Sequence, residues 1–424
     1  MKTITFPQKS AWKSIISRPV ADSSTLLAKV KSVLEEVQQQ GDAAVQKYTL
    51  QFDGVSLTQL SVTEEELQEA VESLDKDLKK AIESAADNIR TFHAHQLKQE
   101  PIVETMKGIQ CWRKSVGIEK VGLYIPGGSA PLFSTILMLG IPASIAGCSE
   151  VILCSPPDKS GKLHPAILFA AQLVGIRKIF KIGGVQAIGA MAYGTETVPA
   201  VYKIFGPGNQ YVTAAKQLVQ MDGLAIDMPA GPSEVCVMAD DTAVPAFVAA
   251  DLLSQAEHGP DSQVLLVSTS ASLINQVNEE LEKQLSALTR KELAAIALSN
   301  SRAVLMNTIE EAIELVNAYA AEHLIIACDQ AEAIAENIVN AGSVFIGNYS
   351  PESVGDYASG TNHTLPTNAY ARMYSGVSVD SFVKKITFQK LTREGLLSIA
   401  GTVEIMAEAE GLSAHARAVT IRTK

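Results

Sequence analysis

The stretch VGLYIPGG, at residues 121–128, decides the fold of this chain of 424 residues. Its first five residues are apolar or small, and they predict a short strand. The Pro-Gly-Gly that follows predicts a sharp turn, where the backbone can approach a ligand closely because glycine has no Cβ atom. Ligands of open α/β sheets bind at the carboxyl ends of the strands. We therefore expect an α/β fold with a ligand crevice beside this turn.

Beyond residue 128, apolar runs alternate with segments of helical periodicity. In the first series, strands are expected at 151–154, 178–182 and 201–205, and helices at 164–174, 185–192 and 209–220. In the second series, helices are expected at 244–258, 309–320 and 330–340, and strands at 264–267, 324–327 and 344–346. Strands that are separated by helices predict parallel pairing. The pattern therefore predicts two α/β units of the doubly wound kind.

The two ends of the chain depart from this alternation. Near the N-terminus, residues 27–40 and 64–96 predict polar helices. Near the C-terminus, a strand is expected from residue 383, followed by helices at 394–409 and 414–422.

A long polar segment, YSPESVGDYASGTNHTLPT, occupies residues 349–367. An irregular segment of this length inside a compact domain is usually functional or disordered. It contains two ionisable candidates, Asp356 and His363, and these favour a functional loop.

Composition and charge exclude several classes of protein. The net charge of −11 and the pI near 5.2 argue against nucleic acid or an anionic membrane as partner, because both select basic surfaces. The most apolar stretch, 131–148, is interrupted by serine, glycine and proline and predicts a buried helix, not a membrane span. The five cysteines form no CxxC pair, and the first residues contain no apolar secretion signal. We expect a cytoplasmic protein.

Gln255 and His258 lie three residues apart near the end of an expected helix, so their side chains share a face. An amide oxygen and an imidazole suit a borderline metal such as zinc. The alternative is a histidine at a helix end that is hydrogen-bonded to the backbone. Two ligands do not make a metal site, and their spacing alone favours this alternative.

Glu322 and His323 are adjacent at an expected helix-to-strand junction. One interpretation is that they act on two parts of one substrate, one as a base for a hydroxyl and the other for a water. The other is a solvated helix terminus, where histidine is favourable. The residues by themselves leave both open.

Three glycine turns follow expected strands, at 126–128, 183–184 and 206–208, and they bring Tyr124, Gln186 and Asn209 near one crevice. No GxGxxG motif follows a strand, so the usual dinucleotide fingerprint is missing. Ordinary turn chemistry would explain the glycines equally well.

A nucleophilic cysteine is a further hypothesis, because oxidation of an alcohol to an acid can pass through a thiohemiacetal. Cys111 and Cys236 are its candidates, but no basic residue lies close to either in sequence. This hypothesis describes a metal-independent aldehyde dehydrogenase, in which a Cys→Ser change abolishes turnover and His258→Ala does not.

Taken together, these segments resemble the histidinol dehydrogenases over almost the whole chain. The longest matching motifs are VGLYIPGG (121–128), STILMLGIPA (134–143), GGVQAIGAMAYGT (183–195), FGPGNQYVTAAK (205–216), DMPAGPSEV (227–235), DLLSQAEHGPDSQ (251–263), EHL (322–324), VGDYASGTNHTLPT (354–367) and EGLSAHARAV (410–419). The chain departs from the family at Ala321, where many members have proline, but the Glu-His pair that follows is intact.

The resemblance implies a zinc-dependent enzyme that oxidises L-histidinol to L-histidine through L-histidinal, with two NAD per turnover. The residues that match the zinc ligands, with one ion per subunit, are Gln255, His258, Asp356 and His415. The residues that match the substrate-binding set are Ser233, Gln255, His258, His323, Asp356, Glu410 and His415. The residues that match the NAD contacts are Tyr124, Gln186 and Asn209.

The resemblance also implies roles for the two catalytic candidates. His323 would remove the hydroxyl proton as hydride leaves for NAD, and Glu322 would then activate a water to form the aldehyde hydrate. His323 would assist the second hydride transfer, and zinc would mainly orient the substrate. A relative that binds metal or metabolite without catalysis is the remaining alternative, and the intact Glu322 and His323 speak against it.

The fold that the resemblance implies is two incomplete Rossmann-like domains, similar to those of aldehyde dehydrogenases, with terminal extensions that intertwine in a homodimer. We expect an N-terminal arm at 1–22 and a first domain from 23–123 and 237–378 that carries the zinc and catalytic residues. A second domain, 124–236, would bind NAD, and 379–424 would extend into the partner's site. The active sites would then be shared between the two subunits.

Overall fold

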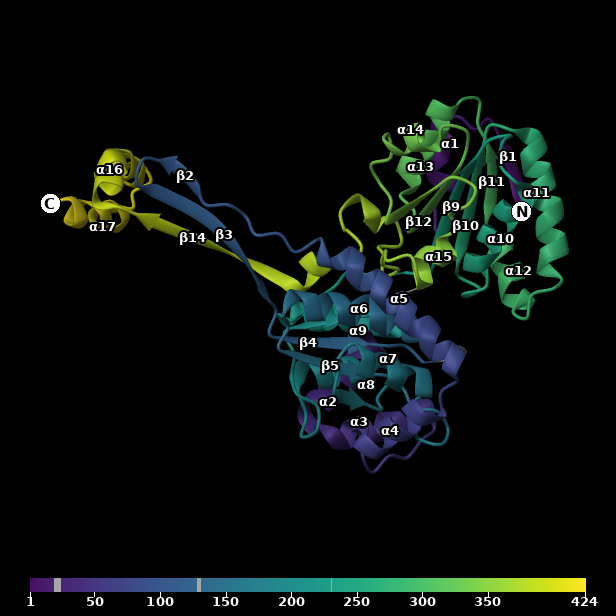
Figure 1. Ribbon diagram of the computed structural model, residues 1–424, viewed down its shortest axis with the longest axis horizontal. Helices are drawn as coiled ribbons and strands as arrows, with labels where there is room; N and C mark the ends of the chain where they lie inside the picture. Colours follow the sequence, from purple (N-terminus) through teal and green to yellow (C-terminus); the bar gives the residue numbers. More distant parts are fainter. Residues whose placement is uncertain (19–23, 128–130, 230) are drawn as a thin grey trace.

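Two parallel sheets and one antiparallel arm make up the computed structural model, which describes residues 1–18, 24–127, 131–229 and 231–424 (Figure 1). The expected α/β class with parallel sheets is confirmed. Gly128 of the opening turn and the end of the expected N-terminal arm lie outside the described residues. No helix of the described part has the length and apolar character that a bilayer crossing requires.

The six-stranded sheet is entirely parallel, in the order β1-β11-β10-β9-β12-β13. Its strands are β1 (Lys2–Thr5), β9 (Glu234–Ala239), β10 (Gln263–Ser268), β11 (Arg302–Leu305), β12 (His323–Ala327) and β13 (Ser343–Ile346). One face packs on helices α10 (Pro245–Ala256), α11 (Ala271–Leu285) and α12 (Lys291–Ser299). The other face packs on α1 (Lys9–Ile15), α13 (Ile309–Tyr319) and α14 (Ala331–Ala335). Both faces are therefore buried, as parallel sheets require.

The five-stranded sheet is also parallel, in the order β6-β5-β4-β7-β8. Its strands are β4 (Lys120–Tyr124), β5 (Glu150–Cys154), β6 (Lys178–Phe180), β7 (Lys203–Phe205) and β8 (Ala225–Ile226). One face is covered by α4 (Glu64–Ser73), α5 (Lys76–Ala94), α6 (Phe133–Ala146) and α7 (Pro165–Leu173). The other face is covered by α2 (Ser24–Gln40), α3 (Asp42–Tyr48), α8 (Gly184–Tyr193) and α9 (Gln210–Met221). The opening stretch thus forms the central strand of this sheet.

The N-terminal helices differ from their expected grouping. Residues 24–94 pack against the five-stranded sheet, whereas 23–123 was expected to form one domain with 237–378. The reason is hydrophobic: the apolar stripes of α2 and α5 cover the two faces of the neighbouring sheet. The expected single helix at 64–96 is broken before Asp75, whose carboxylate accepts hydrogen bonds from two main-chain N–H groups and begins a new helix.

A separate arm projects from the body of the molecule (Figure 1). Its antiparallel sheet has the order β14-β3-β2, with β2 (Val103–Met106), β3 (Ile109–Gly117) and β14 (Val383–Leu391). Helices α16 (Arg393–Ala409) and α17 (Ser413–Thr423) lie at its far end, together with the C-terminus. Segments that are more than 260 residues apart in sequence, β3 and β14, therefore form one structural unit.

The expected loop at 349–367 is not wholly irregular. It contains a short helix, α15 (Glu352–Tyr357), and then a segment that connects the two sheet units. In this segment the Asn362 side chain donates to the Met138 carbonyl oxygen at 2.6 Å, and the His363 Nε2 lies 3.0 Å from the Thr135 hydroxyl. Asp356 is therefore held beside the six-stranded sheet by a segment that is anchored on α6 of the other unit.

Candidate functional site

Glu322 and His323 lie at the amino end of β12, next to the amino end of β9. The chain reaches them from α13 through Ala320, whose φ of +53° lies in the left-handed region that few non-glycine residues adopt. Both side chains are nearly inaccessible, with His323 at 3% and Glu322 at 7% exposure. They are therefore not the solvated helix terminus that the sequence left open.

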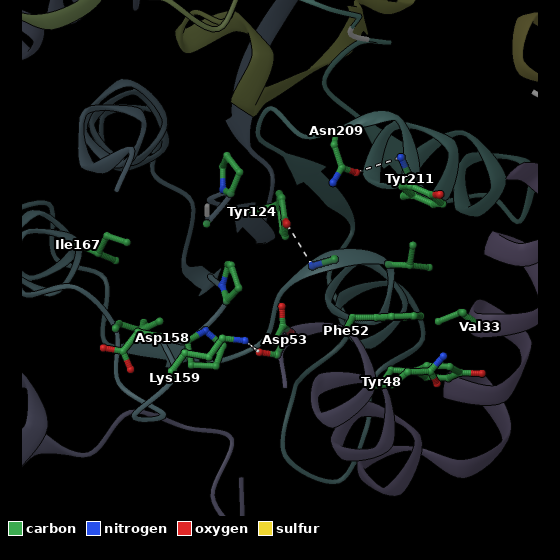
Figure 2. A pocket seen from close by; sticks show the side chains of 18 of the residues that line it. Val33, Tyr48, Phe52, Asp53, Tyr124, Asp158, Lys159, Ile167, Asn209 and Tyr211 are labelled. Atoms are coloured by element: carbon green, nitrogen blue, oxygen red, sulfur yellow. Dashed lines mark hydrogen bonds between the residues drawn. The ribbon is translucent and has the colours of Figure 1, made fainter. Parts of the chain in front are cut away.

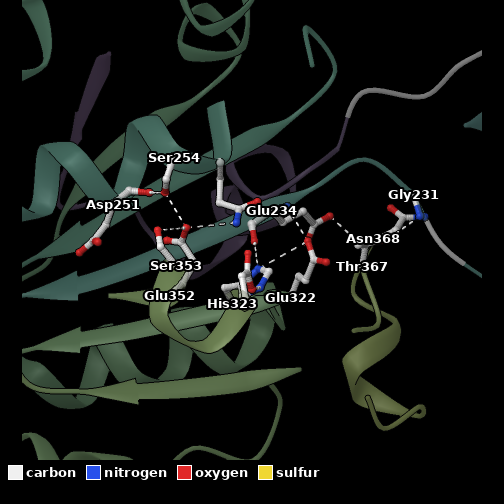
Figure 3. Close-up of polar contacts among 12 residues, drawn as sticks. Gly231, Glu234, Asp251, Ser254, Glu322, His323, Glu352, Ser353, Thr367 and Asn368 are labelled. Carbon is white, nitrogen blue, oxygen red and sulfur yellow. Dashed lines mark hydrogen bonds and ion pairs between the residues drawn. The ribbon is translucent and has the colours of Figure 1, made fainter. Parts of the chain in front are cut away.

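The main chain of Glu234, the first residue of β9, contacts both members of this pair (Figure 3). Its N–H donates to the Glu322 carboxylate at 2.9 Å. Its carbonyl oxygen lies 3.2 Å from the His323 Nδ1, and because a carbonyl can only accept, Nδ1 must carry the proton. The other ring nitrogen, Nε2, faces the Asp356 carboxylate, which when ionised can only accept, so Nε2 also carries a proton in this arrangement.

Asp356 on α15 lies on the Nε2 side of the ring, with its Oδ1 at 3.0 Å. Burial alone would lower the pKa of His323, but the carboxylates of Glu322 and Asp356 raise it. Burial raises the pKa of the Glu322 carboxyl well above its usual range, against the opposing effect of His323. Such perturbed, coupled groups are typical of acid–base chemistry.

Three of the four expected zinc ligands lie near this pair. Gln255 is in the last turn of α10, and its amide Nε2 contacts the Glu352 carboxylate on α15 at 3.4 Å. His258 lies two residues beyond α10 and interacts electrostatically with Asp356. Its ring has no hydrogen-bond partner among the described residues, so the backbone-bonded alternative has no support in the structure.

The fourth expected ligand, His415, lies elsewhere. It is exposed on α17 of the arm, and Glu410 is exposed at the end of α16. Accordingly, the part of the chain that the structure describes contains no group of three or more His, Cys, Asp or Glu side chains placed to hold a metal. Ser233, the remaining member of the expected substrate set, immediately precedes Glu234 at the site.

The expected NAD residues line or adjoin a cavity of about 1470 Å³ at the carboxyl end of the five-stranded sheet (Figure 2). Tyr124 and Asn209 are in its wall, and the Tyr124 hydroxyl accepts a hydrogen bond from the Gly184 N–H at 3.1 Å. Gly206, at φ +125°, is required because a Cβ there would lie 2.0 Å from the Tyr124 carbonyl oxygen. The volume exceeds what a drug-sized ligand fills, and a dinucleotide fits that size class.

Gln186 is fully buried behind this wall. Its Nε2 lies 3.4 Å from the Asp53 carboxylate, while its Oε1 has no partner among the described residues. Asp53 ends a π-helix, Thr49–Asp53, and burial raises its pKa. Sequence reasoning missed Asp53, although π-helical turns are frequent at functional sites; no sequence signal marks such a turn.

Neither cysteine candidate places an exposed thiol beside Glu322 and His323 in this chain. Cys236 is fully buried in the core of the six-stranded sheet, where burial raises the pKa of its thiol. Cys111 lies on β3 of the arm. A buried thiol with a raised pKa is unreactive, because the thiolate is the nucleophile.

Comparisons with known proteins agree with one another over nearly the full chain. A family model described as histidinol dehydrogenase matches residues 16–423. A histidinol dehydrogenase of Bacteroides thetaiotaomicron is 58% identical over 422 residues, which are 100% of this chain and 99% of that protein. A chloroplastic histidinol dehydrogenase of Arabidopsis thaliana is 54% identical and covers 97% of this chain and 88% of that protein. The crystal structure of histidinol dehydrogenase from Elizabethkingia anophelis matches with a TM-score of 0.98 and 55% identity, over 100% and 98% of the two chains.

Proposed function

The chain belongs to the histidinol dehydrogenase family, whose members convert histidinol to histidine in histidine biosynthesis, and we propose that it does so with NAD as hydride acceptor and one zinc ion per subunit. The observation that carries the proposal is the buried Glu322–His323 pair, held by the main chain of Glu234 with Asp356 on its open side. It supplies an acid–base pair at a site that is screened from bulk water.

His323 is proposed as the base for the substrate hydroxyl. Its Nδ1 proton is committed to the Glu234 carbonyl oxygen, and Asp356 would release Nε2 when it binds zinc, so that the unprotonated Nε2 could accept the hydroxyl proton as hydride leaves the carbon for NAD. The product of this first step is the aldehyde, histidinal. The same nitrogen takes the proton of the aldehyde hydrate when the second hydride leaves.

Glu322 is proposed to act on the water that forms this hydrate. Its Oε2 already accepts the Glu234 N–H, and its raised pKa gives the ionised form the basicity that a general base needs. A carboxylate has two acceptor oxygens, so one oxygen of Glu322 can keep its hydrogen bond to the Glu234 N–H while the other binds the water.

The residues beside the pair fit a zinc ion. Gln255 is 1% exposed, and its Oε1 has no partner among the described residues, which is costly unless another group satisfies it. Together with the imidazole of His258 and the carboxylate of Asp356, this oxygen makes an N/O donor set that zinc prefers. Bound zinc would supply a positive charge that orients the imidazole and amine of histidinol.

A second copy of the chain is proposed to complete the site with His415 and Glu410. Both are exposed on the arm, which stands away from its own body (Figure 1). The arm also exposes large apolar side chains, namely Ile102, Val103, Met106, Ile386, Phe388, Leu397, Ile405, Met406, Leu412 and Ile421. An accumulation of large exposed apolar side chains on one small unit is typical of an interface. A homodimer with shared active sites accounts for both observations.

The test of the proposed function is histidinol-dependent formation of NADH. Oxidation of an alcohol to an acid releases four electrons, and NAD takes two of them as a hydride, so we expect two NADH for each histidinol. A chelator should abolish the activity and added zinc should restore it, whereas magnesium should not, because it prefers oxygen donors. No NADH from histidinol at alkaline pH with zinc present would contradict the proposal.

The NAD side of the site gives a second expected result. Gln186→Ala removes an amide whose oxygen has no partner among the described residues, so the KM for NAD should rise about 3- to 10-fold, the loss of one hydrogen bond. Gln220→Ala is the matched control, because Gln220 is exposed on α9. Steady-state kinetics at saturating histidinol measures both. Equal KM values in the two variants would remove Gln186 from the NAD site.

A further inference from the structure

Glu234 is buried directly behind the catalytic pair, and its side chain is not used in the mechanism above. The residue is 1% exposed, and its carboxylate accepts three hydrogen bonds. Arg18 donates to both oxygens, from Nε at 2.9 Å and from Nη2 at 2.8 Å, and the Asn368 N–H donates at 2.8 Å. A bidentate pair of this kind fixes both direction and distance.

Arg18 also holds the segment that leads from α13 to Glu322 and His323. Its Nη2 donates to the Tyr319 carbonyl oxygen at 2.8 Å, and its guanidinium lies 4.0 Å from the centre of the Tyr319 ring. Tyr319 is the last residue of α13, three residues before Glu322. One side chain therefore joins the start of β9 to the segment that leads into β12.

The loop that carries Asp356 is fastened at the same place. The Thr367 hydroxyl accepts the Gly231 N–H, and the next residue, Asn368, donates to Glu234. The Glu234 carboxylate thus accepts hydrogen bonds both from Arg18 of the N-terminal segment and from Asn368 at the end of the loop. The peptide groups of the same residue contact Glu322 and His323.

We propose that Glu234, locked by Arg18, is the positioning residue of the Glu322–His323 pair. The proposal rests on the proposed function. The fixed carboxylate sets the position of the Glu234 peptide groups, which orient the Glu322 carboxylate and, through Nδ1, the His323 ring, so that Nε2 faces Asp356. A displacement of about 1 Å at such a site costs about 10²-fold in rate.

The primary test is Glu234→Gln, which keeps the volume but replaces one acceptor oxygen with a donor. The single-turnover rate of NADH formation should fall about 10- to 100-fold, while the KM for histidinol stays within about twofold, because the binding residues are unchanged. Zinc content should also stay at the wild-type level, since Glu234 is not a proposed ligand.

Glu66→Gln is the matched control. Glu66 forms a partly buried ion pair with Lys181 at 2.9 Å in the five-stranded unit, remote from the catalytic pair. The Glu66→Gln variant should lose about as much thermal stability as Glu234→Gln but should keep the wild-type rate of NADH formation. If Glu234→Gln also keeps the wild-type rate, the ion pair is only structural and the proposal is overturned.

Arg18→Lys tests the same proposal should Glu234→Gln fail to fold. A lysine ammonium retains the charge but cannot make the bidentate contact and still reach Tyr319. Its rate should fall with an unchanged KM, and a wild-type rate in this folded variant also overturns the proposal. Failure of the proposed function is distinguishable, because the wild-type enzyme and Glu66→Gln would then form no NADH from histidinol.

Discussion

Replacing His323 with asparagine is expected to lower kcat for histidinol oxidation about 10²- to 10⁴-fold, the usual contribution of a general base. The amide of asparagine can still donate to the Glu234 carbonyl oxygen, so the local structure should persist. It has no nitrogen that accepts a proton. The loss should therefore appear in kcat for both oxidation steps, measured with histidinol and with histidinal as the starting substrate.

Zinc content distinguishes a base from a ligand in this experiment. His323 is proposed as the base, so His323→Asn should retain the zinc of the wild-type enzyme by metal analysis. His95→Asn is the matched control, because His95 is exposed just beyond the end of α5 and its change should leave both kcat and zinc unaltered. Loss of zinc from His323→Asn would mean that the roles of base and ligand are misassigned.

The parts of the fold that the sequence predicts are those with local periodicity. The apolar run at 121–125 appears as β4, with its turn at the cavity, and the expected strand at 324–327 appears as β12. Parallel pairing follows from the helices between strands. Glycine turns also locate the crevice, since Gly206 is needed where the backbone approaches Tyr124.

The arrangement around the catalytic pair could not be predicted, because it depends on distant pairing. His323 contacts Glu234, 89 residues earlier, and Asp356, 33 residues later. The strand β9, which brings Glu234 there, was not among the expected strands. The one signal in the sequence is a glutamate directly before an apolar run, and this signal does not indicate that Arg18 is its partner.

The strands β2 and β3 of the arm escaped sequence reasoning for a different reason, whereas β14, α16 and α17 match the elements expected near the C-terminus. Strand β2 is exposed along its length and β3 is mostly half-buried, so neither shows a clear alternation of buried and exposed residues. The expected placement of 379–424 in the partner's site stays a prediction, as do the assignments of His415 and Glu410. One chain shows only that these two residues are exposed on a projecting unit.

Mixing two inactive variants is expected to restore activity if the arm serves the partner. His415→Asn keeps a complete body but removes the proposed zinc ligand from its arm, and zinc binding should weaken by more than about 10- to 100-fold, the cost of losing an outer-shell partner. His323→Asn keeps an intact arm but lacks the proposed base in its body. A heterodimer of the two contains one site with both functional parts and one site with neither.

The expected yield is quantitative. Random assortment makes half of the dimers mixed, each with one working site of two, so activity should return to about one quarter of the wild-type value. Heterodimers isolated with two affinity tags should reach about one half. The control mixes His415→Asn with the double variant His323→Asn/His415→Asn, where no complete site can form and activity should stay absent. If isolated heterodimers of the two single variants are equally inactive, the arm acts within its own chain, because a site completed in trans must reappear whenever an intact arm meets an intact body.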